Sequence, residues 1–365
     1  MKIELIDLKK KYQDESKDLL RCVNSVMKNG SFILTKEVTD FEKSICKLLN
    51  IKYCLGLNSG TDALLMSLMS LGISRGDEVI TSPISFVATA HSIVHVGAKP
   101  VFADVGTDLN IDPNQIERLI TKKTKAIMPV HWTGRLCEMD KIKAIAKKYN
   151  LKIIEDAAQA IGAKYNNLYA GTFGDISAFS THPLKNLNGI GDGGFVVTNS
   201  KKLHDKIKRF RNHGMVRRDL AEIVGLNSRL DSVHAKILSF RLTKLNRQIQ
   251  QRNYNISLYE KYLNTKKIQI IKTKKKSYDS STIFITLCEN RNSLQKYLSK
   301  YNIQSLIYYK RPLHMQKSLQ FLGYKKGDLP IAENLCKKVL ALPHHQYLKE
   351  KQVEYICSKI NKFYN

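Results

Sequence analysis

The chain has 365 residues, with 60 Lys and Arg against 32 Asp and Glu, which gives a formal net charge of +28. This length exceeds the size at which one hydrophobic core stops growing, so we expect one large and one smaller domain. No apolar run approaches the roughly 18 residues of a membrane span. The first residues alternate charged and apolar side chains and lack the apolar block of a signal peptide, which predicts a cytoplasmic protein.

The basic residues are spread along the chain, with one dense run at 272–276. Basic surfaces bind nucleic acids by releasing counterions, but no nucleic-acid-binding motif accompanies these residues. We therefore expect no nucleic-acid partner, and steering of anionic substrates explains the charge more simply. The 7 cysteines are scattered singly, without a Cys-x-x-Cys pair, which indicates reduced thiols and no metal site.

Apolar residues at helical spacing predict helices at 11–29 and 36–49, followed by a short apolar strand at 53–57. Strands and helices then alternate strictly. We expect strands at 78–81, 100–104, 126–130 and 151–155, and helices at 87–96, 113–120 and 139–149. This order predicts an α/β protein with a mainly parallel sheet between layers of helices, in which ligands bind beyond the C-terminal ends of the strands.

A strand at 194–198, a basic helix at 201–211 and a long helix from 231 toward 245 complete the expected large domain, 1–249. The pattern then changes. We expect helices at 254–263, 293–301 and 351–363, and strands at 282–288 and near 303–307. This arrangement predicts a smaller α+β domain over 250–365.

A small polar turn, Asn-Ser-Gly-Thr at 58–61, joins the first strand to a helix. The free amides of a helix start and its dipole favour an anion, and the Thr61 hydroxyl adds a donor beside Gly60. The alternative interpretation is an ordinary helix cap without a ligand.

Asp156 ends the strand at 151–155 and is followed by small residues. A carboxylate in this position is costly to bury unless a cation or donor meets it, although it could also cap a helix that begins at Ala157. In that helix Gln159 would lie on the same side, one turn later. Phe86 follows another strand end, where its ring could belong to the core or stack on a planar ligand.

Lys185 lies in a loop rich in glycine and asparagine that follows Phe179 and Ser180. Turns rather than helix or strand packing fix such a lysine. A solvated surface lysine is the simpler interpretation of Lys185 alone. Together, however, the anion-binding turn, the aromatic ring, the strand-end acid and the lysine describe a ligand that is planar, cationic at a ring nitrogen and anionic at a phosphate, with an aldehyde. Pyridoxal 5′-phosphate (PLP) has these properties.

The sequence resembles the sugar aminotransferases of the DegT/DnrJ/EryC1/StrS family from residue 32 to the C-terminal helix. The resemblance rests on motifs that occur in the family's order. They are Asn-Ser-Gly-Thr-Asp-Ala-Leu at 58–64, Gly-Ala-Lys-Pro-Val-Phe-Ala-Asp-Val at 97–105, Glu-Asp-Ala-Ala-Gln-Ala at 155–160, Phe-Gly-Asp at 173–175, His-Pro-Leu-Lys-Asn-Leu at 182–187, Gly-Asp-Gly-Gly at 191–194, Asn-Ser-Arg-Leu-Asp at 227–231 and Pro-Leu-His at 312–314.

The resemblance implies the three-layer fold of PLP-dependent transferases (fold type I) and assigns a role to each matching residue. Lys185 would bind the cofactor covalently and move protons, and Asp156 would pair with the ring nitrogen. The other assignments are contact with the ring hydroxyl by Gln159, stacking by Phe86, phosphate binding by Gly60, Thr61 and Ser180, and contact by Asn227 with the cofactor of the neighbouring subunit in a homodimer.

The family resemblance further implies transfer of an amino group from an amino acid, usually glutamate, through pyridoxamine phosphate (PMP) to a keto sugar. Members that remove a hydroxyl carry histidine in place of this lysine, so Lys185 favours transamination over a dehydratase. A regulatory protein that binds PLP without turnover is the other alternative. A nicotinamide oxidoreductase is disfavoured, because no Gly-x-Gly-x-x-Gly follows the first strand.

The class of substrate is inferred from differences between this sequence and the family's motifs, and from charged residues near those motifs. Tyr308, Tyr309 and Lys310 stand where relatives often have His-Tyr-Pro, just before the motif that contains His314. We expect these four residues, together with Arg229, to contact the substrate. Arg229 and Lys310 would suit a nucleotide diphosphate. The Lys-Asn-Leu and Gly-Asp-Gly-Gly motifs resemble members that act on 3-keto sugars more than those that act on 4-keto sugars.

Overall fold

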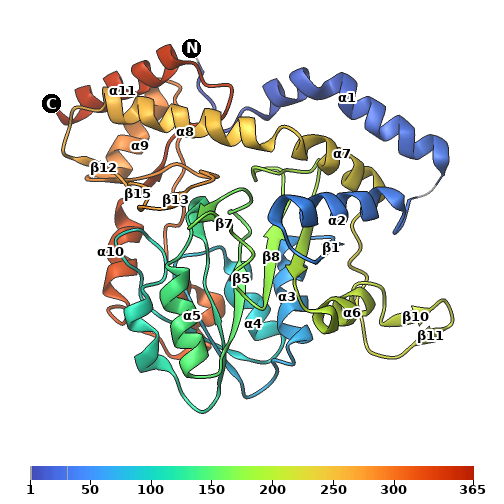
Figure 1. Ribbon diagram of the computed structural model, residues 1–365. Coiled ribbons are helices and arrows are strands. Elements are labelled where there is room, and N and C mark those ends of the chain that lie inside the picture. Colours follow the sequence, from blue (N-terminus) through green and yellow to red (C-terminus); the bar gives the residue numbers. More distant parts are fainter. Residues whose placement is uncertain (1, 31) are drawn as a thin grey trace.

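A computed structural model describes residues 2–30 and 32–365 (Figure 1). The chain begins with two helices, α1 (Leu8–Asn29) and α2 (Lys36–Leu49). α2 buries Val38, Phe41 and Ile45, which recur every three or four residues and so form one apolar stripe. This stripe covers one face of the central sheet.

The central sheet has seven strands in the order β1-β9-β8-β5-β4-β2-β3. Their bounds are β1 Tyr53–Leu57, β9 Gly194–Thr198, β8 Ile176–Ser180, β5 Lys152–Asp156, β4 Thr124–Met128, β2 Glu78–Thr81 and β3 Lys99–Phe102. β9 runs antiparallel to both of its neighbours, and the other strands of the sheet pair in parallel. The predicted α/β fold with a mainly parallel sheet is therefore confirmed.

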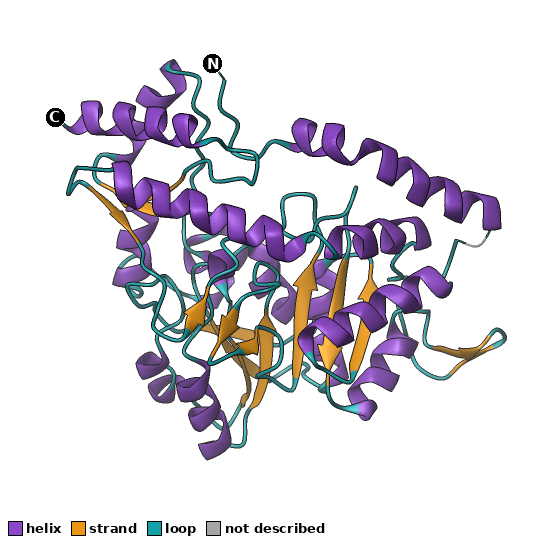
Figure 2. Ribbon diagram, turned by 45° about the horizontal axis from the view of Figure 1, so that its top comes forward, coloured by secondary structure: helices purple, strands orange, loops and turns teal. Residues whose placement is uncertain are grey.

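Helices cover both faces of this sheet, as Figure 2 shows. Neighbouring residues of one strand point to opposite sides, so Ile153 and Ile154 of β5 belong to two different cores. On one side lie α3 (Gly60–Ser70) and α6 (Lys201–Phe210). The helices on the other side are α2, α5 (Met139–Lys148), α7 (Ser232–Leu242) and the start of α8 (Leu245–Tyr262). α4 (Val87–His95) follows β2 and packs beside α3.

The C-terminal part has its own antiparallel sheet of three strands, β12 (Ile268–Ile270), β14 (Ile285–Cys288) and β15 (Val339–Ala341). Its helices are α9 (Arg291–Lys300), α10 (Pro330–Lys338) and α11 (Glu350–Tyr364). One core joins residues of both parts, such as Phe102 and Leu313. The expected boundary after residue 249 falls inside α8, and the division into 1–249 and 250–365 stays a prediction.

Several local predictions were wrong. Residues 113–120 form two short 3-10 helices, η1 (Pro113–Gln115) and η2 (Glu117–Leu119), rather than an α-helix. The expected strand near 303–307 consists of isolated bridges to Ile3 and Ala341. No helix starts at Ala157, because the chain turns instead. β8 (Ile176–Ser180) was not predicted, because Ser177 and Ser180 interrupt its apolar run.

Among the residues described, no helix has both the length and the apolar character that crossing a bilayer requires. Within the same part of the chain, no three His, Cys, Asp or Glu side chains are grouped closely enough to hold a metal ion.

Candidate active site

A cavity of about 290 Å³ lies where β5 and β8 end and where α3 and α4 begin. The C-terminal part closes it with segments near Thr282 and Tyr309. The structure brings most of the predicted site residues together in its wall. Those residues are Gly60, Thr61, Phe86, Asp156, Gln159, Ser180, Lys185, Tyr308 and Tyr309.

Lys185 lies in the loop between β8 and β9, and hydrogen bonds fix the turn around it. Its backbone amide donates to the His182 carbonyl at 2.9 Å, and the Asn188 side-chain amide donates to the Pro183 carbonyl at 2.9 Å. Burial lowers the pKa of Lys185 to about 8, although the negative charge of Asp156 acts in the opposite direction. A larger fraction of Lys185 is therefore a neutral, nucleophilic amine near neutral pH than for an exposed lysine.

Asp156 is the last residue of β5 and is 4% exposed. Its carboxylate accepts hydrogen bonds from the Thr89 hydroxyl at 2.7 Å and from the Ala158 amide at 3.2 Å. Burial raises the pKa of Asp156, and these two bonds and the charge of Lys185 offset that rise only in part. A cationic ligand in the cavity would stabilise the ionised carboxylate.

The preceding residue, Glu155, points to the other side of β5 and is completely buried. It accepts hydrogen bonds from His131 at 2.8 Å and from the amides of Phe173 and Gly174, both at 2.7 Å. Burial raises the pKa of Glu155, but the bonds from His131 and from backbone amides outweigh it and hold that pKa below its ordinary value. The hydrogen bonds of Glu155 are thus made with other groups of the protein, whereas the carboxylate of Asp156 faces the cavity.

Three backbone segments approach one another closely at the start of α3. A Cβ atom on Gly60 would lie 2.7 Å from the Cβ of Ser180, and one on Gly194 would lie 2.5 Å from the backbone carbonyl of Ser59. Only glycine fits at these two positions without displacement. The Ser59 hydroxyl caps the helix by accepting from the Asp62 amide at 3.0 Å. The helix start and the Thr61 and Ser180 side chains therefore border one end of the cavity, as an anion site requires.

Aromatic side chains form another wall. Phe86 immediately precedes α4 and is 56% exposed, and its ring centroid lies 6.5 Å from that of Tyr309. Tyr309 in turn lies 6.1 Å from Trp132. An exposed ring beside a cavity is available to a planar ligand.

Gln159 is held firmly although the expected helix does not form. Its side-chain oxygen accepts from the Thr133 amide at 2.7 Å, and its backbone carbonyl accepts from the Thr282 hydroxyl at 2.6 Å. These bonds place Gln159 in the cavity wall next to Asp156.

The remaining predicted residues lie outside the cavity of this chain. Asn227 is exposed, and its carbonyl accepts from the Asn58 side chain at 3.4 Å. Arg229 donates to the Asn212 side chain at 3.1 Å, and Lys310 is exposed.

His314 is buried in the core beside Phe102 and Tyr324, with its Nε2 atom 3.1 Å from the Glu333 carboxylate. His314 is not among the residues that line the cavity of this chain, and its contact with the substrate stays a prediction.

The sequence reasoning missed several residues of the cavity. Thr89 is three residues after Phe86, so a helix that begins there brings both to the same side, and this spacing could have indicated it. Leu5 comes from the start of the chain, and Ile283 and Leu342 come from its C-terminal part. No local signal could have placed these apolar residues beside Lys185.

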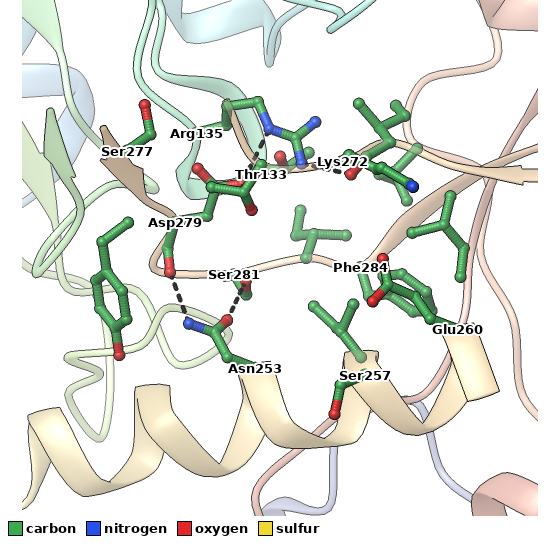
Figure 3. A pocket seen from close by; sticks show the side chains of 17 residues that line it. Thr133, Arg135, Asn253, Ser257, Glu260, Lys272, Ser277, Asp279, Ser281 and Phe284 are labelled. Carbon is green, nitrogen blue, oxygen red and sulfur yellow. Dashed lines mark hydrogen bonds and ion pairs between the residues drawn. The ribbon is translucent and has the colours of Figure 1, made fainter. Parts of the chain in front are cut away.

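A second cavity, of about 220 Å³, is lined by side chains of α8 and of the segment 277–285 (Figure 3). Its polar side chains bond mainly to one another: Arg135 pairs with Asp279 at 3.0 Å, and Asn253 accepts from the Ser281 hydroxyl at 2.6 Å. Its buried acid, Asp279, is already paired with Arg135 and accepts from the Thr273 hydroxyl at 2.8 Å, whereas the first cavity combines the buried Asp156 with the amine of Lys185. The first cavity is therefore the candidate active site.

Comparison with known proteins connects this geometry to a family. The model of the DegT/DnrJ/EryC1/StrS aminotransferase family matches residues 13–361. A pleiotropic regulatory protein of Geobacillus stearothermophilus is 39% identical, and the match covers 100% of this chain and 99% of that protein. The dTDP-3-amino-3,6-dideoxy-alpha-D-galactopyranose transaminase of Aneurinibacillus thermoaerophilus is 36% identical, with 99% of each chain covered.

Solved structures of similar proteins have the same fold as this chain. The crystal structure of DesV from S. venezuelae in complex with a ketimine intermediate superposes with a TM-score of 0.97 at 32% identity, covering 99% of this chain and 98% of DesV. Another similar structure, at 30% identity and a TM-score of 0.89, contains bound PMP.

Proposed function

The chain belongs to the DegT/DnrJ/EryC1/StrS aminotransferase family, and we propose that it moves an amino group from glutamate to a nucleotide-linked 3-keto deoxysugar. It is a PLP-dependent aminotransferase. The observation that carries the proposal is the placement of Lys185 and the buried Asp156 in one cavity whose far end is a helix start. The name of the Aneurinibacillus relative, a 3-amino sugar transaminase, supports the choice of a 3-keto over a 4-keto acceptor.

The cavity fits the cofactor in three respects. Asp156 is a buried carboxylate whose bonds from Thr89 and Ala158 leave its pKa raised, which suits a cationic ring nitrogen. Gly60 and Gly194 let the start of α3 approach Ser180 and β9 more closely than any side chain would allow, and this brings the helix start and Ser180 together at the end of the cavity where the phosphate would bind. The exposed ring of Phe86 can stack on the cofactor.

We assign the holding of the cofactor to these residues: Lys185 as the covalent anchor, Asp156 at the ring nitrogen, Gln159 at the ring hydroxyl, Phe86 on the ring, and Gly60, Thr61 and Ser180 at the phosphate. When bound, PLP supplies an electron sink that stabilises negative charge at the carbon next to the amino group. Asp156, as an anion, keeps the ring nitrogen protonated.

Lys185 then acts as the base and the acid of the reaction. When its Nζ atom does not hold the cofactor, a larger fraction of it is a neutral amine than for an exposed lysine, because burial lowers its pKa to about 8. With the cofactor in place, this amine would take a proton from the alpha carbon of the amino donor as a general base and would give the proton back as a general acid. The sugar half of the reaction uses the same atom in reverse.

We further propose a cytoplasmic homodimer in which the partner completes each site. Asn227 and Arg229 lie outside the cavity of their own chain, and Asn227 is exposed. These positions suit contacts with the phosphate and the sugar nucleotide of a second subunit. Tyr308, Tyr309 and Lys310 are assigned to the sugar side of the cavity, which Tyr308 and Tyr309 line.

The test begins with the absorbance spectrum of the purified protein, in which a lysine-bound cofactor gives a visible band. Lys185→Ala is expected to lose that band and turnover, and appreciable turnover by the variant contradicts the assignment. The protein is then assayed with glutamate and a panel of dTDP-, UDP- and GDP-linked 3- and 4-keto sugars. A band without any conversion would favour a regulatory role, as the name of the Geobacillus relative suggests for that protein.

A further inference from the structure

Two charged residues of α1 are buried although they carry no role in the proposed chemistry. Lys11 is 5% exposed and Glu15 is 2% exposed, and they lie one helical turn apart on the same face. Lysine and glutamate are almost never buried unless they are paired. Their partners therefore show what this face of α1 does.

The partners belong to α7 and to the loop that carries Lys185. Arg241 of α7 donates from Nε to the Glu15 carboxylate at 2.9 Å. The same guanidinium donates from Nη1 to the backbone carbonyls of Asn188 at 2.7 Å and of Gly189 at 3.0 Å. Lys11 completes the arrangement by donating to the Asn188 side-chain oxygen at 2.6 Å.

Asn188 connects Lys11 and Arg241 to the part of the loop that precedes Lys185. Its side-chain nitrogen donates to the carbonyl of Pro183 at 2.9 Å, two residues before Lys185. Lys11, Pro183, Lys185 and Asn188 also line one hollow of about 10 Å³, which is too small for a ligand. The Lys185 loop is thus bonded at Asn188 and Gly189 to a buried ionic group that involves α1 and α7, and Asn188 bonds in turn to Pro183 on the other side of Lys185.

We infer that Lys11 is a positioning residue, which acts through Asn188 to hold the turn at Pro183 and thereby aligns the amine of Lys185 with Asp156. The inference rests on the proposed role of Lys185 as the cofactor anchor. An error of about 1 Å in the position of a reacting group can cost roughly 100-fold in rate, so a brace behind the loop affects chemistry as well as stability.

Lys11 acts as a hydrogen-bond donor rather than as a charge. Burial lowers the pKa of Lys11 to about 7, with Glu15 opposing and Arg241 adding to that shift. Both the ammonium and the neutral amine have an N–H for Asn188, so the bond survives this titration. A shorter neutral donor should therefore replace Lys11 in part, and an apolar side chain should not.

The experiment compares Lys11→Met, which removes the donor, with Lys11→Gln, which has the same chain length as methionine and keeps one. Lys10→Met is the surface control on the same helix, because Lys10 pairs only with the exposed Asp14 in the described contacts. For each holoenzyme we measure kcat, KM for the keto sugar and the pH at which the visible band titrates.

For Lys11→Met we expect a fall in kcat of about tenfold, a change in KM of less than about twofold and a shift of the band's midpoint by about half a pH unit. Lys11→Gln should lie between this variant and the wild type, and Lys10→Met should match the wild type. The inference is overturned if Lys11→Met lowers only the melting temperature and leaves kcat and the titration equal to those of Lys10→Met.

If Lys11→Met does not fold, Asn188→Ala tests the same link from the loop. Asn188→Ala should shift the titration of the band in the same direction as Lys11→Met and should also lower kcat. A wild-type spectrum together with a wild-type kcat would refute the positioning role. A wild-type enzyme without any visible band would instead count against the proposed function, so the two failures are distinguishable.

Discussion

The Thr89 hydroxyl donates to the Asp156 carboxylate at 2.7 Å and so ties the first turn of α4 to the end of β5. This is the only side-chain hydrogen bond to that carboxylate among the described residues. Thr89 is itself buried and also contacts the Ser85 hydroxyl at 2.6 Å. Among the groups that oppose the effect of burial on the pKa of Asp156, Thr89 therefore makes the largest contribution, ahead of the Ala158 amide and the charge of Lys185.

Thr89→Val keeps the shape of the side chain and removes its hydroxyl, so it should raise the pKa of Asp156. A hydrogen bond to a charged group contributes about 1.5–3 kcal/mol, so we expect PLP affinity to fall by about tenfold or more. Absorbance titration of cofactor-free protein with PLP measures this. Thr89→Ser, which retains the hydroxyl, is the control, and equal affinities for the two variants would contradict the prediction.

Gly194→Ala should damage the phosphate end of the cavity, because its Cβ would lie 2.5 Å from the Ser59 carbonyl. Overpacking of this kind costs about 1–3 kcal/mol. We expect weaker PLP binding by about tenfold and a lower melting temperature. Gly191→Ala is the matched control from the same loop, because a Cβ there has no atom within 4 Å. Similar behaviour of the two variants would show that the close approach is not needed.

Capture of added PLP by the cofactor-free protein should depend on pH through Lys185. Only the neutral amine reacts, and its pKa is about 8, so the rate should rise with pH and level off just above pH 8. Asp156→Asn removes a negative charge that favours the ammonium, which lowers the pKa of Lys185 further and moves the profile to lower pH. Stopped-flow absorbance measures these rates. A rate that still rises at pH 10, as for an ordinary lysine of pKa about 10.4, would contradict the burial of this amine.

Glu155→Gln should affect stability more than chemistry. The buried carboxylate accepts from His131 and several amides, and the amide NH₂ of glutamine would face donors there. Removing one member of a buried charged network costs about 3–5 kcal/mol. Denaturant unfolding should show this loss, with a much smaller loss for Asp156→Asn, which serves as the neighbouring comparison. Equal losses of unfolding free energy in the two variants would contradict the conclusion that Glu155 stabilises the fold while Asp156 serves the cavity.

The sequence predicted those parts of the site that short motifs carry. Lys185, Asp156, Gln159 and Phe86 follow strand ends or turns, and a parallel sheet brings such positions to one edge. The other central strands, unlike β8, were recognised because both of their faces are buried, which gives continuous apolar runs.

Other parts could not be predicted because they depend on distant contacts. β8 contains Ser177 and Ser180 among its five residues and so lacks a continuous apolar run, yet it occupies the middle of the sheet. His314 belongs to a matching motif, but its ring packs against Phe102 and Tyr324, and no sequence pattern announces that contact. Leu5 reaches the cavity from the start of the chain. In the sequence Lys11 resembles any other lysine of a basic helix, because its contact with Asn188 of the Lys185 loop joins residues that are far apart in the chain.

The alternation of Glu155 and Asp156 along β5 has an evolutionary consequence. Because successive residues of a strand face opposite sides, inserting or deleting one residue in β5 would exchange the two acids. The scaffold would then receive the shorter carboxylate, and the cavity would receive the longer one at the wrong height. Homologous chains should therefore tolerate many substitutions within β5 but almost no change in its length, and their indels should collect in the loops on either side.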